Sequence, residues 1–146
     1  MWISCLLGVL AVASAIEIPN LNGPAHLDRL YSLPGVPPFK SASYSGYLDA
    51  NKTGKALHYF FVESQSDPYS DPVVIWTNGG PGCSSMLALV QEHGPFYMEE
   101  YGDNFYSNPF AWNLAANILY VEQPAGVGYS LINDTAQLTT NDTISS

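Results

Sequence analysis

The chain has 146 residues, and 47% of them are hydrophobic, which is enough to bury the core of one domain. Four basic residues against thirteen acidic ones give a net charge of -9 at pH 7 and leave no basic patch. Nucleic acids and anionic membranes are therefore poor partners, whereas an acidic secreted or lysosomal protein fits this balance.

Residues 1–15 have the pattern of a secretory signal peptide. They carry no charged side chain, contain an apolar run from Cys5 to Val12 and end in the small residues Ala13-Ser14-Ala15, after which we expect cleavage. The run is too short to span a bilayer, and no second apolar stretch of about 20 residues follows it. We therefore expect residues 16–146 to remain after cleavage, without a membrane anchor.

Glycosylation signals agree with this route, since sequons begin at Asn51, Asn133 and Asn141. Removal of the signal peptide would take Cys5 away and leave Cys83 as the remaining cysteine. In an oxidising compartment such a cysteine calls for a disulfide partner. The sequence thus predicts a glycoprotein of the secretory pathway, destined for a lysosome or vacuole or for the extracellular space.

The first ordered element predicted along the chain is an antiparallel hairpin. Tyr44–Leu48 and Ala56–Val62 are rich in aromatic residues, and the intervening residues 49–54 have the composition of a turn, which would present Asn51 to solvent. Residues 64–71 are polar and predict a loop.

A strand, a glycine-rich loop and a helix follow. Val73–Trp76 is a continuous apolar run, as expected of a strand buried on both faces, and it stops at residues 78–82. A helix is expected over Met86–Glu92, with the hydroxyls of Ser84 and Ser85 available as caps.

The glycine-rich loop is a candidate anion site. Its glycines place backbone N–H groups, which no side chain covers, at the carboxyl end of a strand. However, Gly79, Gly80 and Gly82 fit neither G-x-G-x-x-G nor G-x-x-x-x-G-K-[ST], which disfavours nucleotides as ligands. An oxyanion hole between an early strand and the first helix is one alternative, and a turn needed only for its sharp geometry is the other. The neighbouring Asn78 favours recognition of an anion.

Further strands are predicted after the helix. Gly94-Pro95 ends the helix, short strands at 96–99 and 104–106 flank a turn, and Asn117–Val121 is a second buried strand that leads into a loop at 123–128. A hairpin, then a strand, a glycine loop, a helix and a strand is the opening order of an α/β-hydrolase sheet. The nucleophile strand is missing from this order, and the sequence contains no G-x-S-x-G motif.

Trp76-Thr77-Asn78-Gly79-Gly80-Pro81-Gly82-Cys83-Ser84-Ser85 resembles the W-x-N-G-G-P-G-C-S-S signature of the serine carboxypeptidases. The resemblance implies that 16–146 is the amino-terminal part of their α/β-hydrolase domain. It places the catalytic Ser in a Glu-Ser-Tyr segment beyond Ser146, the Asp and His later still, and the disulfide partner of Cys83 later as well. Further segments match in order and spacing, namely 33–35, 44–48, 57–59, 61–65, 92–96, 112–113, 116–117, 119–120 and 124–128.

The resemblance also assigns roles to residues of the loop. The Gly80 N–H would be one donor of the oxyanion hole, while Asn78 and the Gly79 N–H would bind the terminal carboxylate of a peptide through charge-assisted hydrogen bonds. Trp76 would steady Asn78 from behind. Glu92, which would otherwise be interpreted as a solvated residue at the helix end, would share a proton with a second glutamate and donate a hydrogen bond to the substrate at acidic pH.

The resemblance implies removal of carboxyl-terminal residues from peptides and proteins by acyl-enzyme hydrolysis. It implies no cofactor or metal, and it makes a homodimer of the full-length form an expectation. A non-catalytic secreted binding or protective module is an alternative, because the chain as given lacks the catalytic Ser, Asp and His and is expected to be inactive alone. A related acyltransferase is a further alternative. We interpret His58 and His93 as structural, and Glu99-Glu100 as a solvated surface.

Overall fold

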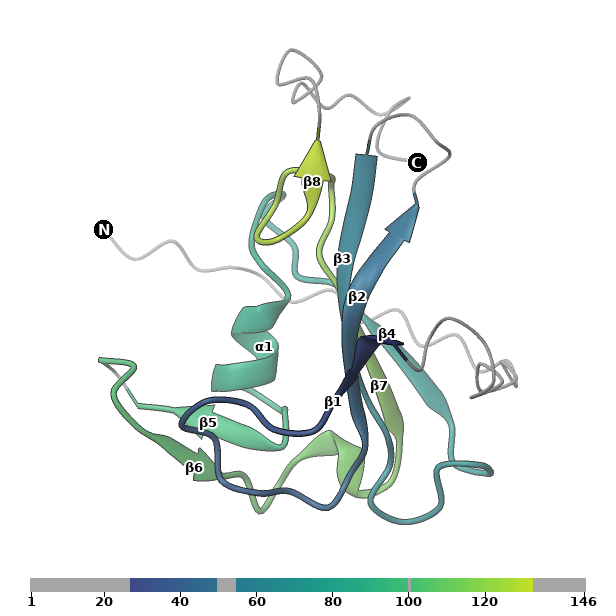
Figure 1. The fold of residues 1–146 in the computed structure, drawn as a ribbon, viewed down its shortest axis with the longest axis vertical. Coiled ribbons are helices and arrows are strands. Elements are labelled where there is room, and N and C mark those ends of the chain that lie inside the picture. The colour runs from purple at the N-terminus through teal and green to yellow at the C-terminus, as the bar shows by residue number, and fades with distance from the viewer. Residues whose placement is uncertain (1–26, 50–54, 100, 133–146) are drawn as a thin grey trace.

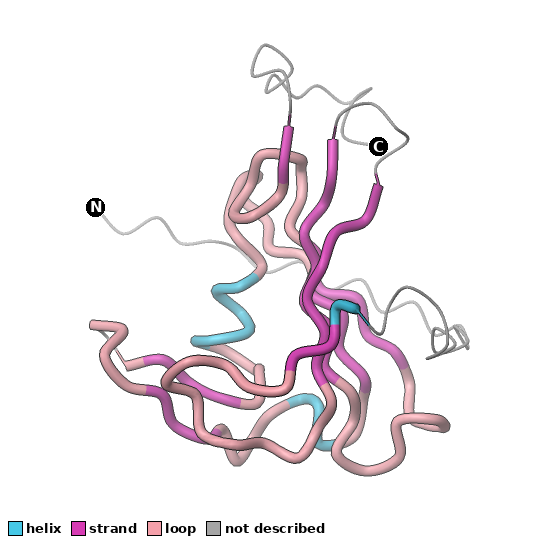
Figure 2. Tube along the Cα trace, viewed as in Figure 1, coloured by secondary structure: helices cyan, strands magenta, loops and turns pink. Residues whose placement is uncertain are grey.

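The computed structural model describes residues 27–49, 55–99 and 101–132. A mixed sheet forms its centre, and the helix α1 and the small hairpin β5–β6 lie on one side of that sheet (Figure 1). Long loops connect these elements, and helix is a minor component (Figure 2). The predicted signal peptide and the three glycosylation sites, Asn51, Asn133 and Asn141, fall outside the described residues.

The main sheet has the strand order β1-β2-β3-β7-β4, and β8 pairs with the start of β3. All neighbours are antiparallel except β4 and β7, which run parallel. The strands are β1 (Arg29–Leu30), β2 (Ser43–Asp49), β3 (Lys55–Val62), β4 (Val73–Trp76), β5 (Phe96–Met98), β6 (Phe105–Ser107), β7 (Asn117–Val121) and β8 (Leu131–Ile132); the helices are α1 (Met86–Gln91) and the 3-10 helix η2 (Trp112–Leu114).

The predicted hairpin is confirmed in β2 and β3, which pair from Ser43 opposite Val62 to Asp49 opposite Ala56. Alternate residues of β3, namely His58, Phe60 and Val62, are buried, as expected when one face of a strand packs on a core. β5, β6 and β7 also form where the sequence predicts strands.

The position of β4 corrects one expectation. We expected Val73–Trp76 to be buried on both faces, but only Trp76 is buried and the other three residues are partly exposed. The reason is that β7 inserts between β3 and β4, so β4 lies at the edge of the sheet and β7 takes the central place. Within the described residues, β4 has a strand on one side only.

The start of α1 differs from the predicted capping. Ser84 Oγ accepts the Met86 N–H at 3.2 Å, but Ser85 makes no side-chain cap and is engaged elsewhere. The helix ends at Gln91, one residue earlier than expected. Gly94 is needed just beyond it, because a Cβ there would lie 1.9 Å from the carbonyl oxygen of Leu89.

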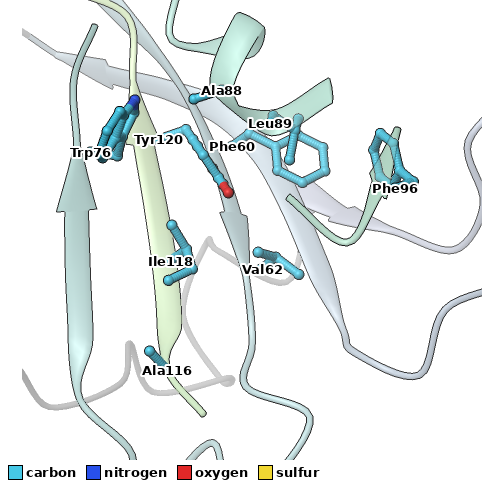
Figure 3. Packing of buried hydrophobic residues seen from close by; sticks show 9 residues of the cluster. All are labelled: Phe60, Val62, Trp76, Ala88, Leu89, Phe96, Ala116, Ile118 and Tyr120. Atoms are coloured by element: carbon cyan, nitrogen blue, oxygen red, sulfur yellow. The ribbon is translucent and has the colours of Figure 1, made fainter. Parts of the chain in front are cut away.

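The core joins the sheet to α1 and β5. Its buried side chains come from β3, β4, β5, β7 and α1, together with Ala116, which precedes β7. Figure 3 shows Phe60, Leu89 and Phe96 grouped between helix and sheet. Ile118 and Tyr120 of β7 are fully buried, which agrees with the predicted buried strand. This packing fixes the end of β4, where the glycine-rich loop begins.

The described residues show neither a membrane-spanning helix nor a cluster of metal ligands. No helix there is long and apolar enough to cross a membrane. The same part of the chain contains no group of three or more His, Cys, Asp or Glu side chains that could hold a metal ion.

Candidate active site

The loop of residues 77–85, which we call the glycine loop, connects the carboxyl end of β4 to α1. At its start, the indole Nε1–H of Trp76 donates to Asn78 Oδ1 at 2.6 Å. Trp76 is buried and Asn78 is partly exposed. The bond occupies the amide oxygen and leaves the Nδ2 hydrogens of Asn78 to donate to a ligand.

The glycines of this loop supply further donors. Gly80 has φ +136° and Gly82 has φ +101°, conformations that other residues rarely adopt. A Cβ on Gly80 would also lie 3.2 Å from the sulfur of Cys83. Neither the Gly79 nor the Gly80 N–H donates a hydrogen bond to another described residue. The loop therefore offers backbone donors next to the amide of Asn78.

Two adjacent serines attach the glycine loop to the end of β7. Ser85 Oγ accepts the backbone N–H of Asn78 at 3.0 Å and donates to the carbonyl oxygen of Val121 at 2.6 Å. Ser84 Oγ donates to Glu122 Oε1. The loop is thus held on both sides of its glycines, by Trp76 at the start and by the serines at the end.

An aromatic layer supports Trp76 from behind. The ring of His93 stacks on Trp112 at 4.1 Å between centroids and meets Trp76 edge-on at 4.4 Å. His93 Nδ1 lies 3.1 Å from the Tyr120 hydroxyl. Burial lowers the pKa of His93 to about 4, so the ring is neutral at neutral pH. These contacts agree with the structural role expected for His93.

Glu92 lies at the C-cap of α1, where its side chain is exposed and its N–H donates to the Ala88 carbonyl oxygen. Burial raises the pKa of the Tyr120 hydroxyl, and the charge of Glu92 adds to that rise. The carboxyl partner that the resemblance implies for Glu92 is not among the described residues, so the shared proton stays a prediction.

A buried network around Glu122 was not predicted from the sequence. Its side chain is fully buried and accepts hydrogen bonds from Ser84, from the Tyr129 N–H at 2.7 Å and, at 3.0 Å, from His58 Nδ1. His58 Nε2 in turn lies 2.8 Å from Ser45 Oγ.

The connection Ser45–His58–Glu122 has the order of a catalytic triad. However, Ser45 lies within the paired strand β2, opposite Phe60. The Glu122 carboxylate also holds the glycine loop and residue 129. We therefore interpret the network as an anchor, which agrees with the structural role predicted for His58.

An apolar cavity of about 490 Å³ lies between the hairpin β2–β3 and α1. Ser45 and His58 contribute to its wall, but no residue of the glycine loop does. This cavity is therefore separate from the hydrogen-bond donors of Asn78, Gly79 and Gly80. The candidate anion site consists of the glycine loop alone.

Comparison with known proteins identifies the family. The family model for serine carboxypeptidases matches residues 34–146. The chain belongs to the serine carboxypeptidase family. It is 53% identical over 119 residues to the lysosomal protective protein of Mus musculus, covering 80% of this chain and 24% of that protein. It is also 53% identical over 128 residues to serine carboxypeptidase ctsa-3.1 of Caenorhabditis elegans, covering 86% of this chain and 21% of that protein.

A solved carboxypeptidase structure is also similar to this chain. The crystal structure of a prohormone-processing carboxypeptidase from Saccharomyces cerevisiae superposes with a TM-score of 0.55 at 27% identity, covering 69% of this chain and 23% of that one. The resemblance to the serine carboxypeptidases is thereby confirmed. The chain spans about a quarter of the length of the curated relatives it matches.

The family membership leaves the individual site assignments to be tested. Cys83 is disulfide-bonded. The resemblance places its partner beyond Ser146, and that pairing stays a prediction. Trp76 and Asn78, which the serine carboxypeptidase signature singles out, are hydrogen-bonded to each other in this chain.

Proposed function

We propose that this chain supplies the terminal-carboxylate site and part of the oxyanion hole of a serine carboxypeptidase, an enzyme that removes carboxyl-terminal residues from peptides by acyl-enzyme hydrolysis. The observation that carries the proposal is the Trp76–Asn78 hydrogen bond, because it commits the amide oxygen of Asn78 and leaves the amide N–H groups beside the backbone donors of the glycine loop. The sheet would be the amino-terminal part of an α/β-hydrolase sheet.

The chemistry requires donors at two positions. The amide of Asn78 and the Gly79 N–H would bind the two oxygens of a substrate carboxylate in charge-assisted hydrogen bonds. The Gly80 N–H would donate to the oxygen of the scissile carbonyl as negative charge develops on it during attack by the catalytic serine. Recognition of the terminal carboxylate beside the scissile bond restricts cleavage to the last residue.

We also propose passage through the secretory pathway. The apolar leader and the sequons support it, as does the similarity to a relative named for the lysosome. The carboxypeptidase would then meet peptide and protein carboxyl termini in a lysosome, a vacuole or the extracellular space.

Binding to the chain itself tests the carboxylate site. A short peptide with a free carboxyl terminus, titrated into ¹⁵N-labelled chain, should shift the side-chain amide resonances of Asn78 and the backbone resonances of Gly79. The same peptide with an amidated terminus should shift neither. Equal shifts with both peptides, or no shift with either, would contradict the proposal.

Replacing Trp76 by phenylalanine should weaken binding of the free-carboxyl peptide about tenfold, because the ring stays but the donor to Asn78 Oδ1 is lost, at a cost of about 1 to 1.5 kcal/mol. Trp112→Phe is the matched control, since it shortens a neighbouring tryptophan of the same aromatic layer. It should bind the peptide within about twofold of wild type. Equal losses in the two variants would mean that packing, and not the bond to Asn78, matters.

Glu92→Gln tests the proposed acidic partner, in an enzyme that carries this chain together with its catalytic serine. At neutral pH, two ionised carboxyls would repel the substrate carboxylate, and the substitution removes one of them. The KM for a free-carboxyl peptide should therefore rise less between acidic and neutral pH in the variant than in wild type, while kcat at the acidic optimum changes less than kcat/KM.

Two controls complete the Glu92 experiment. An amidated substrate has no terminal charge and should show little difference between the enzymes, and Glu99→Gln, at an exposed position, should follow wild type. If KM depends on pH identically in Glu92→Gln and wild type, Glu92 is a solvated residue at the helix end.

A further inference from the structure

The backbone of Asn78 is fixed by a residue that the carboxylate site does not itself include. Ser85 is 1% exposed, and its single hydroxyl accepts from the Asn78 N–H and donates to the Val121 carbonyl oxygen. A hydroxyl can make both bonds because it is donor and acceptor at once. Ser85 therefore ties the glycine loop to the last residue of β7.

A second link between the glycine loop and β7 joins Ser84, which precedes Ser85, to Glu122, which follows Val121. Ser84 donates to Glu122, the residue that follows β7. A buried carboxylate is costly unless it is well hydrogen-bonded, and Glu122 is held by His58 of β3 and by the Tyr129 N–H as well. The carboxylate is thus fixed from separate parts of the chain before it holds the loop.

The packing around Glu122 leaves it little room to move. Gly128 has φ +55°, and a Cβ there would lie 1.9 Å from Glu122 Oε1. The ring of His58 is fixed in turn by Ser45 at 2.8 Å. Glu122 is therefore a rigid point of attachment for Ser84.

We propose that Ser85 and Glu122 are positioning residues for carboxylate recognition, and this inference rests on the function proposed above for Asn78. Ser85 fixes the backbone of Asn78, Trp76 fixes its side chain, and Glu122 holds the loop in register through Ser84. A donor group fixed before binding loses less conformational entropy when the ligand arrives, so the anchors raise affinity without touching the ligand.

The first test needs no variant. The Asn78 N–H lies in a partly exposed loop beyond the end of β4, where an amide without an acceptor exchanges fast with solvent. If Ser85 is its acceptor in solution, hydrogen exchange at Asn78 should be slowed at least tenfold relative to an unprotected amide. Unprotected exchange at Asn78 in the wild-type chain would overturn the proposal.

Two variants then test the anchors separately. Ser85→Ala removes both bonds of the hydroxyl, and Glu122→Gln replaces an acceptor by a side chain that is partly a donor, which opposes the donors around it. Both should accelerate exchange at Asn78 and weaken binding of a free-carboxyl peptide by about tenfold. Ser107→Ala and Glu99→Gln are the matched controls at exposed positions and should behave as wild type.

Hydrogen exchange at core amides distinguishes a local change in the glycine loop from unfolding of the whole chain. Exchange at Ile118 and Val62, both buried in the central strands, should stay within about threefold of wild type in a folded variant. If one of the two variants does not fold, the other still decides. Peptide binding at wild-type strength in a variant with accelerated exchange at Asn78 would overturn the positioning role.

The same data distinguish failure of the function from failure of the inference. If the free-carboxyl peptide binds to no protein in the set, wild type included, the proposed carboxylate site is wrong and the recognition role of the anchors is overturned with it. If the peptide binds wild type, Ser85→Ala and Glu122→Gln equally, the carboxylate site stands and the inference alone is overturned. Weaker binding in both variants, with unchanged controls and accelerated exchange at Asn78, supports both.

Discussion

Replacing Asn117 by alanine should lower the free energy of unfolding of the chain by about 3 kcal/mol. Asn117 is fully buried at the start of β7, and its side chain uses three hydrogen bonds to hold residues 64–71. Oδ1 accepts the Ser64 N–H at 3.0 Å, and Nδ2 donates to the carbonyl oxygens of Pro68 and Asp71, each at 3.1 Å. Alanine would leave the buried Ser64 N–H without an acceptor and remove both donors.

Urea unfolding of the two proteins measures this difference. The matched control is Asn104→Ala, because Asn104 is exposed and its Nδ2 donates to Glu99 Oε2 at 2.8 Å. A single exposed hydrogen bond of this kind contributes little, so the control should stay within about 0.5 kcal/mol of wild type. Similar losses in the two variants would show that the burial of Asn117 does not matter.

Asn117 also shows what local pattern predicts and what it does not. The apolar run after it predicted a buried strand with the observed bounds, 117–121, because burial on both faces selects such a run. The pattern did not show that β7 would pair with β3 and β4 together. Strand order depends on contacts between residues far apart in sequence, which a local pattern does not contain, and this is why β4 was wrongly placed inside the sheet.

The shortest strands were not predicted at all. β1 and β8 have two residues each, too few for a period of two to be visible. They form because β2 and β3 offer edges to pair with: Arg29 lies opposite Tyr44, and Leu131 lies opposite Ala56. Their existence is a consequence of the hairpin and not of their own sequence.

The candidate site, too, could be predicted from the sequence only in part. Trp76 and Asn78 are two positions apart, and the signature that contains them could be recognised directly in the sequence. The hydrogen bonds of Glu122 could not be recognised there, because Ser84 and Glu122 are 38 positions apart in the sequence and His58 and Glu122 are 64 apart. The available signal was a lone glutamate directly after the buried strand 117–121, where a charged residue needs partners.

The second large effect that we predict is a loss of folding stability at acidic pH, caused by His93. The imidazole of His93 is buried among Trp76, Trp112 and Tyr120, and its Nε2 has no hydrogen-bond partner in the described part of the chain. Burial lowers its pKa from 6.5 to about 4. Between these two values the unfolded chain binds a proton at His93 that the folded chain does not, so stability falls as pH falls through this window.

His93→Phe should therefore reduce the acid sensitivity of the fold. Between pH 7 and pH 4.5, wild type should lose about 2 to 3 kcal/mol more of its unfolding free energy than the variant does, since phenylalanine can stack but cannot be protonated. Urea unfolding at several pH values measures both slopes, and the carboxyl groups contribute equally to the two proteins. Burial raises the pKa of Tyr120, which thus stays neutral throughout the window.

The nearby carboxylate gives the control. Glu92 precedes His93 and is exposed, and Glu92→Gln introduced into both proteins should leave the difference between their slopes unchanged. If wild type and His93→Phe lose stability in parallel as the pH falls, His93 is protonated in the folded protein without cost. The ring of His93 would then be charged in the folded protein at acidic pH. In that case Trp76 would be packed against a buried imidazolium and not against a neutral ring.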